Sequence, residues 1–268
     1  MGNKTEALDG QAERLAEMII DSERAVVFTG AGISTESGIP DFRGPGGIWE
    51  KYDPSDFTYQ RFLGDPESRR RHWDFYLNGG FGSEDEVSPN PAHHAVAELH
   101  SMGKVHCIIT QNVDNLHQRA GVPEDRVIEL HGNMRWVKCL DCGKRSTLAE
   151  VVQWARENSI DEPRCEICGG MLKPQAVFFG ESLPERALAD ATHYSSNCDL
   201  FIVIGSTLVV TPAAFMPSYA VQNGARLVII NIGATPMDRQ ATMVVEARAG
   251  EFMAKVVERV KDKVGTQA

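Results

Sequence analysis

The sequence predicts an α/β protein: a Rossmann-like, doubly wound parallel sheet with a smaller zinc-ribbon plus helical module. Short runs of apolar, β-branched residues alternate with stretches of helical periodicity, which is typical of a parallel sheet covered by helices. Glycine-bearing or polar turns follow several of these runs, at the strand ends where such sheets bind ligands. Two CxxC pairs lie near the middle of the chain and indicate a unit stabilised by a metal.

The composition is that of an ordinary globular protein. Of 268 residues, 42% are hydrophobic and 24% are charged, and the length suits one large or two small domains. The net charge of −10 argues against a nucleic-acid-binding surface, which needs a basic footprint. The same charge fits a basic partner such as a lysine-rich peptide, although solubility alone explains it equally well.

The sequence shows no pattern of a targeting or membrane segment. Residues 1–20 are charged and lack the apolar core of a signal peptide, and no run approaches about 18 apolar residues. The myristoylation pattern is incomplete because position 6 is a glutamate. We therefore expect a cytoplasmic protein with no membrane partner.

Predicted strands and helices alternate along the chain. Apolar β-branched or aromatic runs predict strands over residues 25–28, 105–110, 127–130, 176–179, 200–204, 227–231 and 244–246. Amphipathic spacing, together with turn and cap residues, predicts helices over residues 8–22, 92–102, 148–157, 184–194, 212–222 and 250–264.

Two interruptions of this alternation divide the chain into three parts. The parts are a Rossmann-like nucleotide-binding domain (1–44, 104–135 and 173–268), a helical insertion (45–103) and a zinc-binding module (136–172). The aromatic residues of the insertion are expected to pack its own core and one side of a cleft. Its charge run, residues 69–71, is expected to form a solvated helix face.

A glycine-bearing turn leaves the first predicted strand. Gly30 and Gly32 match the first two glycines of the dinucleotide motif GxGxxG, but Thr35 occupies the third position. Such a turn lets the backbone approach a ligand, with N–H groups free to cradle phosphate. Ser34 and Ser37 are candidate helix caps that would place a positive dipole end beneath an anion. The residues alone leave a nucleotide-binding turn and a plain strand-to-helix turn both open.

The cysteines form the most specific chemical pattern. Each CxxC pair places two thiolates on one turn, and two such turns close a tetrahedral site that suits structural zinc. Redox dithiols and unpaired core thiols are the alternatives. The predicted zinc ligands are Cys139, Cys142, Cys165 and Cys168, and the core cysteines are Cys107 and Cys198.

Polar groups follow the second and third predicted strands. Gln111, Asn112 and Asp114 lie where a doubly wound sheet places ligand groups, although capping of the next helix explains an Asn or Asp there as well. His131 ends the third strand and is followed by a glycine, so it is free to face a cleft, with a pKa suited to general-base catalysis.

Together these motifs resemble those of the sirtuins, the NAD-dependent protein-lysine deacylases. TGAGIS, GIPDFRG, TQNVDNLH, ELHG, the paired CxxC, FFGE, GSTLVV and NIG occur in the order found in that family, from about residue 24 to residue 252. The resemblance implies NAD and a structural zinc as cofactors. It also implies an acyl-lysine-containing protein or peptide as the partner, with no direct nucleic-acid binding.

The resemblance assigns roles to the matching positions. It implies His131 as the catalytic base, and Asn112 and Asp114 as the pair that lines the nicotinamide pocket. Residues implied in NAD binding are Gly30, Ala31, Gly32, Ser34, Asp41, Phe42, Arg43, Gln111, Asn112, Val113, Asp114, Gly205, Ser206, Thr207, Asn231, Ile232, Gly233 and Ala249. Residues implied in binding an extended acyl-lysine peptide, by strand addition, are Val177, Phe178, Phe179, Gly180, Glu181 and Val209.

The implied reaction uses NAD as the donor of a leaving group and not of a hydride. The amide oxygen of an acyl-lysine attacks the nicotinamide ribose and expels nicotinamide. His131 then acts as general base toward a ribose hydroxyl, which attacks the resulting imidate, and water completes the release of lysine and O-acyl-ADP-ribose. One alternative is a protein ADP-ribosyltransferase. The other is a zinc-stabilised NAD sensor without turnover, and the presence of His131, Asn112 and Asp114 argues against this second alternative.

Some positions on the peptide side depart from the family pattern. Thr211 stands where tyrosine is common, and Gln175-Ala176 replaces the usual Asp or Asn and branched residue. Tyr76 matches the Tyr-x-x-Arg pair of sirtuins that prefer acyl carboxylates, but Gly79 fills the arginine position. Acetyl or longer apolar acyl groups are therefore expected as substrates over succinyl.

Overall fold

The computed structural model of the protein describes residues 2–42, 44, 46–80 and 87–265. The largest element is a sheet of six strands, all parallel to their neighbours, in the order β3-β2-β1-β7-β8-β9. These strands are β1 (Ala25–Thr29), β2 (Cys107–Thr110), β3 (Val127–Glu129), β7 (Leu200–Ile204), β8 (Arg226–Ile230) and β9 (Met243–Val245). The doubly wound sheet predicted from the sequence is thus confirmed.

The order of the strands places the switch point of the sheet between β1 and β7. The chain moves outward from β1 to β2 and β3, and then returns to lay β7 against the other side of β1. Doubly wound sheets bind ligands where the connections diverge in this way. Thr29 lies level with Thr110 on one side and with Ile204 on the other, so the loops after the three central strands emerge at one edge.

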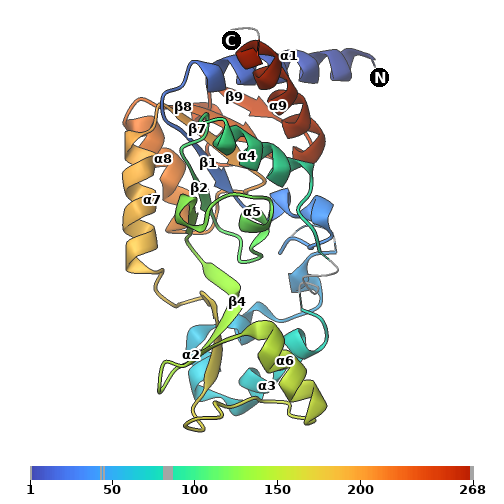
Figure 1. The fold of residues 1–268 in the computed structure, drawn as a ribbon, viewed down its shortest axis with the longest axis vertical. Coiled ribbons are helices and arrows are strands. Elements are labelled where there is room, and N and C mark those ends of the chain that lie inside the picture. The colour runs from blue at the N-terminus through green and yellow to red at the C-terminus, as the bar shows by residue number, and fades with distance from the viewer. Residues whose placement is uncertain (1, 43, 45, 81–86, 266–268) are drawn as a thin grey trace.

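Helices cover both faces of the sheet (Figure 1). Because side chains alternate along a strand, Ala25 and Val27 enter one core, whereas Val26 and Phe28 enter the other. The first core is covered by α1 (Gly2–Ile20), α4 (Pro91–Ser101) and α9 (Ala249–Gly265), and the second by α7 (Glu185–Asn197) and α8 (Met216–Gln222). Burial on both faces explains why β1 and β7 are apolar along almost their whole length.

Helix α4 packs on the large sheet, although its residues, 91–101, belong to the insertion predicted from the sequence (45–103). Ala92, Val96 and Leu99 lie on one face of α4 and are fully buried in the core shared with α1 and α9. Their spacing of three and four residues produces the apolar face that directs the helix onto the large sheet.

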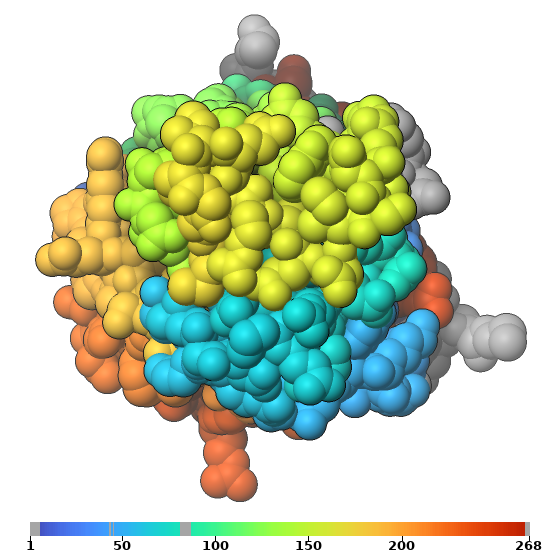
Figure 2. All heavy atoms as spheres, turned by 90° about the horizontal axis from the view of Figure 1, so that it is seen from below, coloured from blue at the N-terminus to red at the C-terminus, as the bar shows by residue number. Residues whose placement is uncertain are grey.

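A smaller module lies below the large sheet in Figure 1. Among the described residues it contains an antiparallel sheet in the order β5-β4-β6 and three α-helices. Its elements are β4 (Gly132–Cys139), β5 (Arg145–Thr147), β6 (Leu172–Ala176), α2 (Tyr59–Gly64), α3 (Pro66–Leu77) and α6 (Leu148–Glu157). Figure 2 shows α2 and α3 side by side with the cysteine-bearing segment. A shared core that includes Trp73, Val137 and Leu172 joins the insertion to the cysteine-bearing segment.

The charge run on α3 is not a uniformly solvated face, so that prediction is wrong for Arg69. This side chain is buried and pairs with Glu162 at 2.7 Å. Its guanidinium also donates to the carbonyl oxygens of Phe62 and Leu63. Because Arg69 precedes Trp73 by one helical turn, it shares the face that packs inward. A cation at this place is stable because a carboxylate and two carbonyls surround it.

The chain after β1 forms two 3-10 turns, and neither is capped by the serine side chains proposed as helix caps. Ser34 precedes the second turn without a capping bond to it, and Ser37 is the last residue of that turn, so the prediction of two helix caps is wrong. The strand expected over residues 176–179 also differs, because β6 ends at Ala176 and only Phe179 then forms an isolated bridge. The short elements are η1 (Ala31–Ile33), η2 (Thr35–Ser37), η3 (Ile48–Glu50), η4 (Pro54–Phe57), α5 (Leu116–Arg119), η5 (Glu124–Arg126), η6 (Ala213–Phe215) and η7 (Asp238–Gln240).

No helix in the described part of the chain combines the length and the apolar character needed to cross a bilayer.

Gly132 opens β4 where the chain passes from the large sheet into the small module. Its φ of 72° lies in the left-handed region, and a Cβ there would lie 2.0 Å from the carbonyl oxygen of Gln175. We predict that Gly132→Ala lowers the free energy of unfolding by about 2 kcal/mol or more, measured by urea denaturation.

Gly103→Ala is the matched control, because Gly103 has a φ of 71° but no atom within 4 Å of the added Cβ. Equal losses in the two variants would show that the close approach of β4 to β6 is not the constraint at Gly132.

Candidate active site

The two glycine-bearing turns meet at the switch point of the sheet. The Gly30 N–H donates to the carbonyl oxygen of Ile204 at 3.1 Å, and the Gly32 N–H donates to that of Gly205 at 2.8 Å. A Cβ on Gly32 would lie 2.7 Å from the Cα of Gly205, so side chains would separate the turns. The expectation that these amides are free for phosphate is wrong for Gly30 and Gly32, because they hold the turns together.

A hydrogen-bonded cluster joins the first turn to the loop after β2. The Asn112 side-chain amide donates to the Gly30 carbonyl oxygen at 3.2 Å and to the Ser34 hydroxyl at 3.1 Å. The Ser34 hydroxyl in turn donates to Asp114 Oδ2 at 2.7 Å. Ser34, predicted as a helix cap, instead links the amide and the carboxylate that the sequence singled out.

Asp114 is held by hydrogen bonds through both of its carboxyl oxygens. Its Oδ1 accepts from the Leu116 N–H, the first of α5, at 3.0 Å, although the N-cap residue itself is Asn115. Burial raises the pKa of this carboxyl group, and the hydrogen bonds from Leu116 and Ser34 oppose that rise. The fixed oxygens thus place a carboxylate with defined orientation beside Asn112.

A buried layer of hydroxyl and imidazole groups, which the sequence analysis did not single out, lies beneath this cluster. The Thr29 hydroxyl donates to the Thr110 hydroxyl at 2.8 Å and lies 2.9 Å from His117 Nε2. Burial lowers the pKa of His117 to about 4, so its ring is neutral. The only sequence signal for this layer is that polar residues end two otherwise apolar strands.

Gln111 connects the loop after β2 to the turn after β7. Its side-chain amide donates to the Ser206 hydroxyl at 2.7 Å, and that hydroxyl also accepts from the Leu208 N–H at 3.3 Å. Thr207, which lies between Ser206 and Leu208 in the sequence, is exposed. The structure thus brings together Gln111 and Ser206, which lie 95 positions apart in the sequence.

His131 lies between β3 and β4, at the junction of the two modules. Its Nδ1 is 2.9 Å from the carbonyl oxygen of Gln111, which can only accept, so Nδ1 carries the hydrogen in the neutral ring. Burial lowers the pKa of His131, and the bond to Gln111 opposes this effect. The remaining lone pair is therefore on Nε2.

The turns after β8 and before α9 form the outer end of the same edge. The Asn231 side-chain amide donates to the carbonyl oxygens of Ile232 at 3.1 Å and Gly233 at 3.0 Å, so it shapes its own turn. Ile232 is 66% exposed although apolar, whereas Ala249 is buried at the start of α9. Glu36, which the sequence analysis missed, fixes α9 by accepting from the Gly250 N–H at 2.7 Å.

An aromatic contact links the loop after η2 to the predicted peptide segment. The Phe42 ring lies 5.3 Å from the Trp49 ring, which lies 5.9 Å from that of Phe179. Asp41 Oδ1 accepts from the Gly44 N–H at 2.6 Å and closes the turn. Arg43 lies outside the described residues. Trp49, one of the aromatic residues expected to pack the core of the insertion and one side of a cleft, contacts both predicted binding segments.

The predicted peptide segment, residues 177–181, is anchored on both sides by backbone bonds. The Val177 N–H donates to the carbonyl oxygen of His131 at 2.8 Å. Phe179 donates to the Phe57 carbonyl oxygen at 3.0 Å and accepts from the Tyr59 N–H at 2.9 Å. Phe178 is buried beneath it. The residues of the predicted peptide surface that remain exposed are Phe179, Gly180 and Val209.

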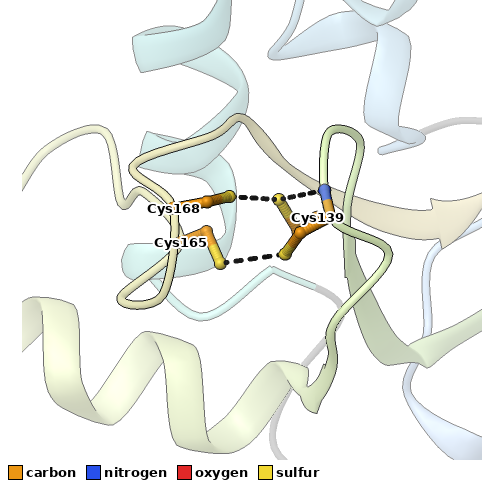
Figure 3. A group of neighbouring side chains, drawn as sticks. Cys139, Cys165 and Cys168 are labelled. Carbon is orange, nitrogen blue, oxygen red and sulfur yellow. Dashed lines mark hydrogen bonds between the residues drawn. The ribbon is translucent and has the colours of Figure 1, made fainter.

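The four predicted zinc ligands converge in the small module. Their sulfurs all lie within 4.8 Å of one another. The sulfurs of Cys139 and Cys168 are 3.5 Å apart and those of Cys142 and Cys165 are 3.7 Å apart. Figure 3 shows the side chains of Cys165 and Cys168, from one loop, pointing toward Cys139 on the facing turn. A Zn–S distance of about 2.3 Å in a tetrahedron places sulfurs about 3.8 Å apart, so this donor set fits zinc.

We predict that a strong chelator removes one zinc per chain and unfolds the small module, because Cys139 and Cys165 belong to its core. All four tryptophans, Trp49, Trp73, Trp136 and Trp154, lie in the insertion or the cysteine-bearing segment, so their emission reports on this module. Unfolding of the module exposes these tryptophans to water, so we expect their emission maximum to shift to longer wavelength. Cys165→Ala should cause the same shift, but Cys198→Ala should not, because the Cys198 thiol is buried in the large domain. An unshifted spectrum after complete zinc removal would contradict a structural role.

Comparison with known proteins gives consistent matches over nearly the whole chain. A family model described as the Sir2 family matches residues 30–212. The "NAD-dependent protein deacylase 2" of Archaeoglobus fulgidus is 44% identical over 257 residues, covering 95% of this chain and 98% of that protein. A solved structure of Sir2 with a p53 peptide and NAD+ has a TM-score of 0.80 and 40% identity, covering 94% of this chain and 98% of that one.

A second solved structure, of a Sir2 variant with a deacetylated p53 peptide and 3′-O-acetyl-ADP-ribose, has a TM-score of 0.83 at 41% identity. It covers 94% of this chain and 98% of its own chain. The resemblance that the motifs indicate therefore extends to the sequence, the fold and the cysteine cluster, and the chain belongs to the Sir2 family.

Proposed function

We propose that this protein is an NAD-dependent protein-lysine deacylase that releases nicotinamide, deacylated lysine and O-acyl-ADP-ribose. The observation that carries the proposal is the position of His131. Its Nδ1 is held by Gln111, and its backbone is bonded to Val177 in the segment that resembles the peptide-binding strand. An imidazole with a fixed tautomer, which suits a general base, thus lies between the polar edge of the sheet and the predicted peptide surface.

The groups at the sheet edge fit a dinucleotide extended across the switch point. The Asn112 amide and the Asp114 carboxylate, both oriented by Ser34, would hold the nicotinamide group. The turns at Gly205 and Asn231 would take the phosphates and the adenosine. When bound, NAD supplies a ribose carbon that reacts with an acyl oxygen as nicotinamide leaves.

The chain's own part in the chemistry is proton transfer and exclusion of water. His131 Nε2, free of hydrogen in the neutral ring, would take a proton from a ribose hydroxyl. The bond from Nδ1–H to the Gln111 carbonyl oxygen stabilises the imidazolium that then forms. Phe42 and Trp49 would shield the reacting carbon from solvent.

The acyl side of the site supports apolar acyl groups as substrates. The Tyr76 side chain is buried, and its hydroxyl donates to the Met134 sulfur at 3.9 Å. Gly79, at the position of the arginine in carboxylate-preferring sirtuins, has a φ of 104°, which favours glycine. No cation from this position would therefore meet a succinyl carboxylate.

The decisive experiment supplies the purified protein with NAD and matched acetyl-, propionyl- and succinyl-lysine peptides, and identifies the products by mass spectrometry. We expect O-acetyl- and O-propionyl-ADP-ribose, with the succinyl peptide turned over at least about tenfold more slowly. ADP-ribose attached to protein without a free acyl ester would favour an ADP-ribosyltransferase. NAD binding without any product would favour a sensor.

We predict that His131→Ala lowers kcat/KM for the acyl peptide by about 10²- to 10⁴-fold, because it removes the general base. The dissociation constant for NAD, measured by calorimetry, should change little. His106→Ala is a matched control, since His106 lies beside Tyr194 and away from the sheet edge that carries the site. Unimpaired turnover by His131→Ala would remove this residue from its proposed role.

The pH dependence should reflect the lowered pKa of His131. Its pKa lies below the ordinary value of 6.5 because burial disfavours the charged ring. A base acts in its neutral form, so kcat/KM should still be above half its maximum at pH 6.5 and fall through the half-maximal point only below that pH. Burial also raises the pKa of Asp114, so the profile of Asp114→Asn separates its contribution. A half-maximal point at or above pH 6.5 would contradict the assignment.

The three-part division of the chain and the cytoplasmic location are also part of this proposal. The nucleotide-binding domain would comprise residues 1–44, 104–135 and 173–268 together with α4. The cytoplasm is supported by the chemistry of the cysteines, because none of the six, all of which lie in the described residues, forms a disulfide and four of them are arranged to hold a metal ion. Cell fractionation with detection of the full-length chain tests the location.

A further inference from the structure

Lys173 is a buried cation beneath the predicted peptide segment, and no motif of the sequence drew attention to it. The residue is 5% exposed in β6. Its ammonium group donates to the carbonyl oxygens of Pro174 at 3.1 Å and Ala176 at 2.8 Å, and pairs with Glu181 Oε2 at 2.9 Å. Three acceptors thus match the three hydrogens of one ammonium group.

Glu181 completes a closed loop of interactions around residues 174–181. The same Oε2 that pairs with Lys173 accepts from the Phe178 N–H at 2.8 Å. The Glu181 N–H in turn donates to the Phe178 carbonyl oxygen at 3.0 Å. The ion pair therefore fixes a backbone turn, and its desolvated charges have close partners on both sides.

Aromatic packing fixes the remaining freedom of this turn. The Lys173 ammonium lies 4.1 Å from the centre of the Phe178 ring, within the range of a cation–π contact. The buried ring of His72 lies 4.5 Å from Phe178. Burial, reinforced by Lys173, lowers the pKa of His72 to about 3, so this neighbour is neutral and does not compete with Lys173 for the Glu181 carboxylate.

We propose that Lys173, through its ion pair with Glu181, is a positioning residue for the acyl-lysine peptide. This inference rests on the proposed function, since it takes residues 177–181 as the surface that pairs with the substrate. The turn closed by the Lys173–Glu181 ion pair, here called the clamp, includes Val177, whose N–H donates to the carbonyl oxygen of His131. One buried lysine thus holds the peptide surface in register with the catalytic histidine.

The test compares Lys173→Met, which keeps the length of the side chain but removes its charge, with Glu181→Gln, which keeps an acceptor for the Phe178 N–H. Lys255→Met is the matched control. Lys255 also forms an ion pair, with Asp9 at 3.1 Å, but it lies on α9 against α1, at the opposite end of the molecule. Each variant is first checked for zinc content and for a cooperative unfolding transition.

We expect Lys173→Met to raise the KM and the dissociation constant for an acetyl-lysine peptide by about tenfold, because a charged hydrogen bond that orders the surface is lost. Glu181→Gln should act in the same direction, and the KM for NAD should stay within about twofold in both. Lys255→Met should leave all three quantities unchanged. If Lys173 had only a structural role, Lys173→Met would lower the melting temperature and the fraction of active protein, but it would not raise the KM for the peptide relative to the KM for NAD.

Hydrogen exchange supplies a readout that does not need turnover. Amides of residues 177–181 should exchange faster in Lys173→Met and in Glu181→Gln than in the unmodified protein, and unchanged exchange would overturn the proposal. Unchanged peptide affinity in folded, zinc-loaded Lys173→Met would overturn it as well, and if that variant does not fold, Glu181→Gln decides. Failure of the unmodified protein to deacylate any peptide would contradict the proposed function, while the exchange result still decides the role of the clamp.

Discussion

The close approach of two backbone turns at the switch point is the constraint on which the rest of the site depends. Gly30 and Gly32 lie against Gly205, and the turns bond to each other directly. The approach fixes the spacing between β1 and β7 at the edge, and with it the positions of Ser34 and Ser206. Those two hydroxyls in turn orient Asn112, Asp114 and Gln111. The glycines therefore act first on the protein itself, and the positions of the proposed binding groups follow from the geometry they allow.

The sheet could be predicted from the sequence because its strands are short, apolar runs that are separated by glycine, proline and polar turn residues. Period-two packing explains why Val26 and Val27 enter different cores, and a run that is apolar at both positions can only be buried on both faces. The cysteine quartet was predictable for a similar reason, since ligand spacing is a local property. Groups that depend on long-range contacts were not predictable: Glu36 accepts from the Gly250 N–H, 214 positions away, and the Asn90 side chain donates to the Ile33 carbonyl oxygen, 57 positions away.

The errors share a physical origin, which is that tertiary partners override local patterns. Arg69 belongs to a charge run that suggests solvent, yet the helix turns it inward, where Glu162 receives it. Ser34 has the sequence context of a helix cap, yet its hydroxyl is taken by Asp114. In both cases the side chain satisfies a distant group that the local sequence does not show.

The position of Trp49 has a consequence for how the two substrates affect each other. Its ring touches Phe42, on the loop expected over the dinucleotide, and Phe179, on the surface expected under the peptide. A ligand that orders Phe42 or Phe179 also restricts the indole ring of Trp49. The second ligand then causes a smaller loss of conformational entropy when it binds. The two occupancies are then thermodynamically coupled, and by reciprocity the factor by which one ligand tightens the other is the same in both directions.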